Sequence, residues 1–262
     1  MTDSAATPDT VISADGTTIA YERSGSGRPA LVIVTGAFND RVSSASLAAG
    51  LRARFDVYRF DRRGRGDSGD THPWSVAREV EDLAAVIAAT GGAPFVYGHS
   101  SGAALALEAA AAGVPMRRLV AYEPPYTGTS GAHASQADEL DALVAEGRLE
   151  DAAIAFLRGT DAPPGAIEAA RSAPHWPAMV ALAPTLSYDV RLVNGGEPPV
   201  ERLGSVAVPV LAAAGGLSPD WALRATDAVA AAVPDGRAGL VEGQTHLVSN
   251  GALLPVLSEF FV

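Results

Sequence analysis

The first 90 residues alternate short strand-like runs with longer helix-like segments. Residues 11–22 form two stretches of alternating polar and apolar positions around Asp15-Gly16, a dipeptide that favours a tight turn because both residues tolerate positive φ, so a β-hairpin is predicted. Continuous apolar runs follow at 30–35 and 55–60, and such runs are typical of parallel strands buried on both faces. Two segments with apolar residues at helical spacing are predicted as helices, at 44–54 and 75–89.

The same alternation continues through the rest of the chain and predicts the fold class. Strands are predicted at 95–97, 118–122, 208–213 and 237–241, and helices at 101–112, 220–232 and 251–262. Repeated strand–helix units imply a mostly parallel sheet with helices on both faces. We therefore expect an α/β fold.

Residues 124–199 interrupt this alternation. They contain no convincing strand but several helical patches, at 137–146, 149–157, 165–170 and 177–182. Since a structureless loop of that length is improbable within a compact domain, we predict a helical insertion between two strands of one sheet, called here the cap segment (residues 124–199). The predicted core then comprises residues 1–123 and 200–262.

The composition narrows the classes of function. The 262 residues are 48% hydrophobic, enough for a sizeable core, and include no cysteine, which excludes disulfides, thiolate metal sites and a cysteine nucleophile. An excess of acidic residues, 30 against 19 basic ones, gives a formal net charge of −11, which repels nucleic acids and anionic membranes. We expect a small-molecule substrate, no nucleic-acid or membrane partner, and a monomer or homodimer.

The chain shows no targeting signal. Residues 1–10 are polar and lack the basic and apolar regions of a secretory signal, and no apolar stretch reaches the ~18 residues of a transmembrane helix. These features predict a cytoplasmic protein.

The strongest chemical signal is Gly98-His99-Ser100-Ser101-Gly102, which lies between an apolar strand and an Ala-rich helix. In such a G-x-S-x-G turn the serine occupies a strained strand-to-helix junction, and the glycines allow neighbouring backbone to come close. The N-terminus of the following helix favours a developing negative charge. This context predicts Ser100 as a nucleophile, and the structural alternative is a glycine-lined turn without chemistry.

A serine nucleophile needs a base, and the chain has five histidines. His246 follows the last predicted strand in Gly243-Gln244-Thr245-His246, so its loop returns to the strand ends where Ser100 is expected. The other histidines lie in the G-x-S-x-G turn (residues 98–102, called here the elbow), in a loop or in the cap segment. They are His99, His72, His133 and His175. We predict His246 as the base, against the alternative of a loop or capping histidine.

Two carboxylates compete to orient that base. Glu123 ends the predicted strand next to the elbow strand, and it is long enough to reach across from there. Asp220 lies two residues after Ser218, which stands roughly where the chain order serine, acid, histidine most often places the acid. Structurally, Glu123 could be a rim carboxylate bonded to backbone N–H groups, and Asp220 a helix N-cap. Glu123 is the favoured acid and Asp220 the alternative.

Donors for an oxyanion are expected from two backbone segments. One N–H belongs to Ser101, the residue after the nucleophile, and another to the loop Gly36-Ala37-Phe38-Asn39 after the third strand. Ala37 or Phe38 would supply the second N–H, and Phe38 could equally form a wall of the acyl pocket.

The glycine- and arginine-rich run 61–69 lacks the spacing of a phosphate-binding loop, so we predict a tight loop whose charges pair locally and brace the site.

The elbow, the run Asp61-Arg62-Arg63-Gly64-Arg65-Gly66-Asp67-Ser68-Gly69 and the segment 243–246 together resemble the α/β-hydrolase superfamily, over roughly Val11 to Val262. The resemblance implies an eight-stranded, mostly parallel sheet with a helical cap after strand six, and it implies no metal or cofactor. Most members have an Asp acid after strand seven, where this chain has Ser218. Some members, including certain haloalkane dehalogenases and zearalenone-type lactonases, use a Glu after strand six, the place of Glu123.

The resemblance also narrows the reaction. Epoxide hydrolases and dehalogenases carry Asp at the position of Ser100, and cofactor-free perhydrolases commonly carry Met at that of Ser101. The leading hypothesis is a hydrolase that cleaves a carboxylic ester or lactone of a small, largely apolar substrate through a Ser-His-acid triad and an acyl-enzyme. The alternatives are a C–C bond hydrolase or hydroxynitrile-lyase-like enzyme on the same triad, and a non-hydrolytic ligand-binding member of the fold.

Substrate contacts are expected from the elbow, from the loop 36–39 (called here the oxyanion loop) and from an aromatic face of the cap segment. The candidate residues are Phe38, His99, Trp176, Met179 and Tyr188. For the cap residues the alternative is that they pack the cap segment onto the core.

Overall fold

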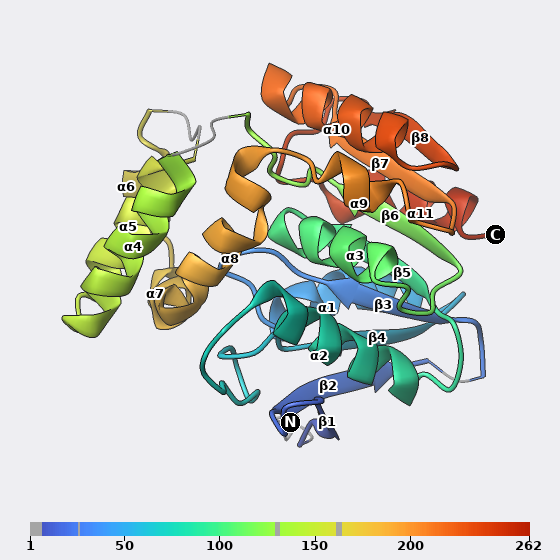
Figure 1. Cartoon of the computed structure of the whole chain (residues 1–262), viewed down its shortest axis with the longest axis horizontal. Helices are drawn as coiled ribbons and strands as arrows, with labels where there is room; N and C mark the ends of the chain where they lie inside the picture. Colours follow the sequence, from blue (N-terminus) through green and yellow to red (C-terminus); the bar gives the residue numbers. More distant parts are fainter. Residues whose placement is uncertain (1–6, 26, 129–131, 161–163) are drawn as a thin grey trace.

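Eight strands form one sheet in the computed structural model, which describes residues 7–25, 27–128, 132–160 and 164–262 (Figure 1). The strands are β1 Asp9–Ile12, β2 Thr18–Ser24, β3 Ala30–Val34, β4 Asp56–Phe60, β5 Phe95–His99, β6 Arg118–Tyr122, β7 Val210–Gly215 and β8 Gly236–Val241. Their order is β1-β2-β4-β3-β5-β6-β7-β8. β2 pairs antiparallel with β1 and β4, and the other neighbours pair parallel. The predicted fold class is confirmed. Residues 1–6, part of the stretch searched for an export signal, lie outside the described residues.

Helices cover both faces of the sheet because alternate strand residues enter two separate hydrophobic layers. Val32 and Val34 of β3 belong to one layer, and Leu31 and Ile33 to the other. The first layer contains α2 Val76–Ala89, α3 Ser101–Ala111, α9 Val200–Leu203 and α10 Asp220–Ala232. The second contains α1 Ala45–Leu51 and α11 Asn250–Phe260. Burial on both faces explains why the parallel strands read as continuous apolar runs.

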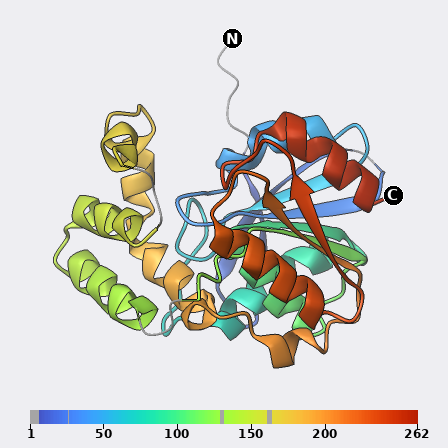
Figure 2. The ribbon, with the colours of Figure 1, turned by 90° about the horizontal axis from the view of Figure 1, so that it is seen from above.

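The described residues of the cap segment form five α-helices between β6 and the short helix α9. They are α4 Ala132–Ala145, α5 Leu149–Arg158, α6 Ala166–Arg171, α7 Trp176–Ala181 and α8 Leu186–Leu192. Figures 1 and 2 show α4 to α7 to one side of the sheet, with α8 between them and the core. The first four overlap the predicted helical patches. The division of the chain into a core and a cap segment stays a prediction.

Helix α8 was not predicted, and its burial explains why. Leu186, Ser187, Tyr188, Asp189, Val190 and Leu192 are all buried. A helix buried nearly all round lacks the polar face that produces a 3.6-residue pattern.

The parallel pairing brings the C-terminal ends of β3, β5, β6, β7 and β8 to one edge of the sheet. The residues just beyond these ends include Gly36, Ser100, Glu123, Ser218 and His246. Among the described residues, no helix has the length and apolar character to cross a membrane.

Candidate active site

Ser100 occupies a strained turn between β5 and α3. Its backbone has φ 57° and ψ −129°, and its N–H donates to the carbonyl of Tyr122 at 2.9 Å. The turn requires glycine on both sides. A Cβ on Gly102 would lie 2.2 Å from the carbonyl oxygen of Val34, and one on Gly98 would lie 2.6 Å from the Cα of Ala103. These close approaches are the reason for the two glycines of the G-x-S-x-G motif.

Backbone strain collects at this edge of the sheet. In the part of the chain that the structure describes, the non-glycine residues with positive φ are Phe38 at 58°, Ser100 at 57° and Glu123 at 47°. Such conformations cost on the order of 1–3 kcal/mol each and tend to persist at functional sites. All three are residues that the sequence nominated, and they follow β3, β5 and β6.

Glu123 contacts His246 directly. The two side chains lie 2.7 Å apart, from Glu123 Oε2 to His246 Nδ1. The other carboxylate oxygen accepts hydrogen bonds from the Gly215 N–H at 2.8 Å and from the Ser218 hydroxyl. Burial raises the pKa of Glu123, but the hydrogen bonds from His246, Ser218 and Gly215 outweigh it and hold the pKa below its usual value. The carboxylate is therefore ionised at neutral pH.

Two side chains hold the backbone that carries His246. The Tyr122 hydroxyl donates to the Thr245 carbonyl at 2.8 Å, and His99 Nε2 donates to the His246 carbonyl at 2.9 Å. The rings of His99 and His246 lie 4.9 Å apart between centroids. With Nδ1 on the carboxylate, the Nε2 of His246 remains for a reacting group. The structure thus brings His246 to the elbow, beside the residue that precedes Ser100.

His99 is kept neutral. Burial and, to a smaller extent, the neighbouring His246 ring lower its pKa from 6.5 to about 4, against the opposing effects of the His246 carbonyl and the Glu123 carboxylate. The sequence nominated His99 as a substrate contact, whereas the contacts seen here hold the His246 loop.

Asp220, the alternative acid, lies apart from this pair. It is exposed in the first turn of α10, whose N-cap is Pro219. Ser218, two residues earlier, is instead the residue of this loop that reaches Glu123. The serine at the position where most members of the family have the acid therefore donates to Glu123, the predicted acid.

The loop after β3 passes directly against the elbow. A Cβ on Gly36 would lie 2.8 Å from the Cβ of Ser100, so the following Ala37 and Phe38 begin next to Ser100. The Phe38 ring packs edge-on against Phe156 of α5, with centroids 5.2 Å apart. Ser101 is the first residue of α3, where a backbone N–H has no acceptor within its own helix. Both predicted sources of oxyanion donors therefore adjoin Ser100.

The aromatic residues of the cap segment have other contacts. Trp176 is buried in α7, and its Nε1 donates to Glu150 of α5 at 3.3 Å. Met179 is half-buried on the same helix. The Tyr188 ring stacks on Trp74 at 5.0 Å, and its hydroxyl donates to Asp70 at 2.8 Å.

Tyr188 faces a cleft that the catalytic candidates do not line. The cleft has a volume of about 730 Å³ and is lined by Asp70, His72, Pro73, Trp74, Asp141, Val144, Ala145, Pro184, Tyr188 and Arg191. Consecutive helical residues point about 100° apart. In α8 the neighbouring Asp189 points to the elbow, so Tyr188 points elsewhere.

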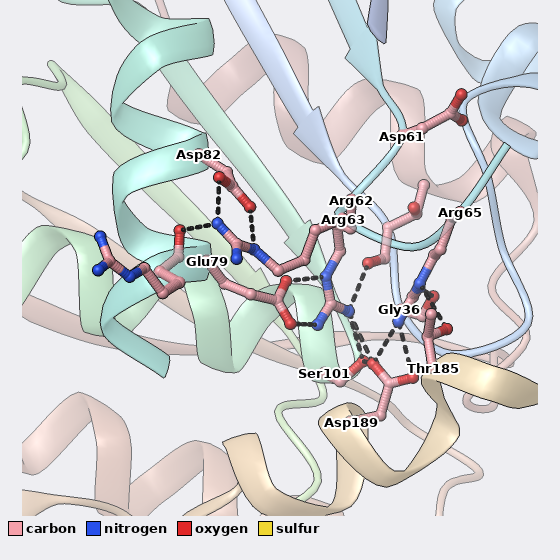
Figure 3. Close-up of polar contacts among 12 residues, drawn as sticks. Gly36, Asp61, Arg62, Arg63, Arg65, Glu79, Asp82, Ser101, Thr185 and Asp189 are labelled. Atoms are coloured by element: carbon pink, nitrogen blue, oxygen red, sulfur yellow. Dashed lines mark hydrogen bonds and ion pairs between the residues drawn. The ribbon is translucent and has the colours of Figure 1, made fainter. Parts of the chain in front are cut away.

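Sequence reasoning missed Asp189. This buried carboxylate accepts a hydrogen bond from Ser101 Oγ at 2.6 Å and pairs with Arg62 and Arg65 (Figure 3). The arginines of the run 61–69 were expected to pair locally, but Arg62, Arg63 and Arg65 pair with acids of α2, α8 and the β1–β2 turn. The only sequence signal for Asp189 is one acid in a mostly apolar stretch. Among the described residues, no group of three or more His, Asp or Glu side chains is arranged to hold a metal ion.

Comparisons with known proteins agree with this architecture. A profile of the alpha/beta hydrolase family matches residues 31–252. The crystal structure of an alpha/beta hydrolase from Sphaerobacter thermophilus is 46% identical and superposes with a TM-score of 0.90, over 97% of this chain and 100% of that one. An enol-lactonase from Burkholderia xenovorans, at 18% identity, superposes with a TM-score of 0.77 over 97% and 99% of the two chains, and shares the fold.

One curated relative matches over part of its length. An N-formylmaleamate deformylase from Pseudomonas putida is 36% identical over 121 residues, which is 45% of this chain and 45% of that protein. The match thus spans less than half of the relative.

Proposed function

Because this chain belongs to the alpha/beta hydrolase family, we propose that it is a serine hydrolase that cleaves a carboxylic ester or lactone of a small, largely apolar substrate. The observation that carries the proposal is the 2.7 Å contact between Glu123 and His246, next to a serine in a strained elbow. A nucleophile, a base and an orienting acid are the parts that acyl transfer requires.

In the proposed reaction, Ser100 Oγ attacks the substrate carbonyl while His246 Nε2 takes its proton. The ionised Glu123 holds Nδ1–H and stabilises the imidazolium. Backbone N–H groups of Ser101 and of Ala37 or Phe38 stabilise the oxyanion. His246 returns the proton to the leaving alkoxide, which gives an acyl-enzyme and an alcohol. Water then repeats the sequence, releasing the acid and restoring Ser100.

The apolar side chains beside the loop after β3 support an apolar acyl group. Phe38 and Ala37 pack against a cluster of buried cap residues, Ala137, Leu140, Ala152, Ala183, Leu186 and Val190. Arg62 and Arg65 lie near the elbow, but both are buried and already form ion pairs with carboxylates, so they do not favour a strongly anionic substrate.

A second candidate reaction is hydrolysis of an N-formyl amide. It is favoured by the 36% identity to the N-formylmaleamate deformylase, over the 121 matched residues. The same nucleophile, base and oxyanion donors would serve, with an amide nitrogen as the leaving group. Rates on p-nitrophenyl esters, lactones and N-formyl amides of similar size separate the two candidates.

Labelling with a fluorophosphonate tests the shared chemistry. Folded wild-type protein should react stoichiometrically, with the adduct on Ser100 by mass spectrometry, and Ser100→Ala should not react. Ser101→Ala serves as the neighbouring control for labelling position. Absence of an adduct on Ser100 in folded wild-type protein refutes the proposal.

A further inference from the structure

Asp189 lies at the junction of the cap segment, the elbow and the oxyanion loop. Asp189 is only 2% exposed. Its carboxylate accepts hydrogen bonds from two arginines of the run 61–69 and from the serine that follows Ser100 (Figure 3). Arg65 Nη2 donates to both of its oxygens, at 2.9 and 2.8 Å, and Arg62 Nη1 donates to Oδ1 at 2.7 Å. The Ser101 hydroxyl donates to Oδ1 at 2.6 Å.

The two arginines extend this cluster to the backbone around Ser100. Arg65 Nη1 donates to the carbonyl oxygens of Gly36 at 2.7 Å and Asn39 at 3.2 Å, which flank Ala37 and Phe38. Its Nε donates to Thr185 Oγ1 at 3.1 Å, next to the start of α8. The oxyanion loop is therefore tied to the cap segment through one guanidinium.

Arg62 connects the same carboxylate to the opposite side of the elbow. Its Nε and Nη2 form a bidentate pair with Glu79 of α2, at 2.6 and 2.7 Å. Its Nη1 also approaches Ser101 Oγ at 3.3 Å. Ser101 is thus held through its side chain, while its backbone N–H is left for the oxyanion.

Charge balance makes the cluster depend on Asp189. Two buried guanidinium groups face two buried carboxylates, Glu79 and Asp189. Burial raises the pKa of Asp189, but the charges of Arg65 and Arg62 outweigh it, so the pKa lies below its usual value. Such a cluster contributes little to stability compared with apolar packing, and it is more readily explained by the geometry that it specifies.

We propose that Asp189 is a positioning residue that, through Arg65 and Ser101, fixes the two backbone segments whose N–H groups stabilise the oxyanion, and so makes that geometry depend on the cap segment. The inference rests on the proposed serine-hydrolase function. Oxyanion donors act only when they lie close to the developing charge, so a small displacement of either segment weakens them.

The test compares Asp189→Asn and Ser101→Ala with wild type, using p-nitrophenyl acetate as substrate and phenylboronic acid as a probe that forms a tetrahedral adduct on serine. In Asp189→Asn, kcat and boronate affinity should each fall roughly tenfold to a hundredfold, with KM changed by less than about threefold. Ser101→Ala keeps the backbone N–H and the charge balance, and both quantities should fall about threefold to tenfold. The rate constant of fluorophosphonate labelling should fall in parallel.

Asp141→Asn is the matched control, because Asp141 is an exposed cap acid paired with Arg191 at 2.8 Å. It should leave kcat and boronate affinity within about twofold of wild type. If Asp189→Asn does not fold, the kcat and boronate affinity of Ser101→Ala test the proposal. Wild-type kcat and boronate affinity in folded Asp189→Asn or in Ser101→Ala would overturn the proposal. Failure of wild-type protein to react with the fluorophosphonate would instead refute the proposed function.

Discussion

Directly after β6, Glu123 adopts a φ of 47°, and its carboxylate reaches the N–H of Gly215 at the end of β7 and the ring of His246 in the loop after β8. Glu123→Gln keeps the shape but removes the charge that stabilises the imidazolium. We expect kcat to fall by roughly 10² to 10⁴ with the fold retained, measured on p-nitrophenyl acetate and by circular dichroism.

Asp220→Asn is the matched control for that variant. Asp220 is exposed in the first turn of α10, so its substitution should leave kcat within about twofold of wild type and change stability by at most about 1 kcal/mol. A nearly inactive Asp220→Asn with a nearly normal Glu123→Gln would return the role of the acid to the loop after β7.

His99 makes folding stability depend on pH. Its pKa is about 4 in the folded protein against an ordinary value of 6.5, so the unfolded chain binds a proton there that the folded protein does not. The contribution of neutral His99 to the free energy of unfolding is therefore complete above pH 6.5. As the pH falls from 6.5 towards 4, the free energy of unfolding decreases by at most about 3 kcal/mol on account of this group.

His99→Gln removes the titration and keeps an N–H donor. Urea unfolding of both proteins between pH 7 and 4 should show a shallower loss of unfolding free energy in the variant, and superimposable slopes would contradict the assignment. The variant also tests whether the bond from this side chain to the His246 carbonyl is needed for activity.

Among the elements, α3 shows how small residues position Ser100. Ser101 to Ala110 are all buried, and the helix begins so close to β3 that Gly102 leaves no room for a Cβ beside the Val34 carbonyl. Gly102→Ala should therefore displace the helix start and lower the unfolding free energy by at least about 2 kcal/mol, measured by urea denaturation.

Gly251 is the equivalent second residue of α11, and a Cβ there meets nothing within 4 Å. Gly251→Ala should leave stability unchanged or raise it by less than about 1 kcal/mol. Equal losses in the two variants would show that the helix position, and not the contact with β3, causes the effect.

At the scale of the whole molecule, a net charge of −11 destabilises the folded state through repulsion among surface acids. Raising NaCl from 20 to about 500 mM at pH 7 should screen this repulsion and raise Tm by about 2–4 °C in scanning calorimetry. The buried pairs around Asp189 are screened much less. Near the isoelectric point of about 4.8 the same salt step should have little effect. A fall in Tm at pH 7 would contradict the prediction.

The sequence alone determined the features that depend on neighbouring residues. Apolar runs and helical spacing predicted the α/β sheet, because burial of an element on one or two faces determines which of its neighbouring positions are apolar. The elbow could be predicted because a strained turn beside β3 needs glycine at Gly98 and Gly102. Chain order and strand ends were enough to nominate Ser100, His246 and Glu123.

The tertiary structure alone decided which of these side chains meet. Contact between Glu123 and His246 spans 123 positions of the chain, and that between Ser101 and Asp189 spans 88, so no local pattern records either. The sequence left Asp220 open as the acid and nominated Tyr188 as a substrate contact. In the structure Ser218 donates to Glu123, the Tyr188 hydroxyl donates to Asp70, and Asp189 accepts a hydrogen bond from Ser101. Side-chain direction depends on how α8 and the β7 loop dock on the sheet, and docking is a property of the assembled core.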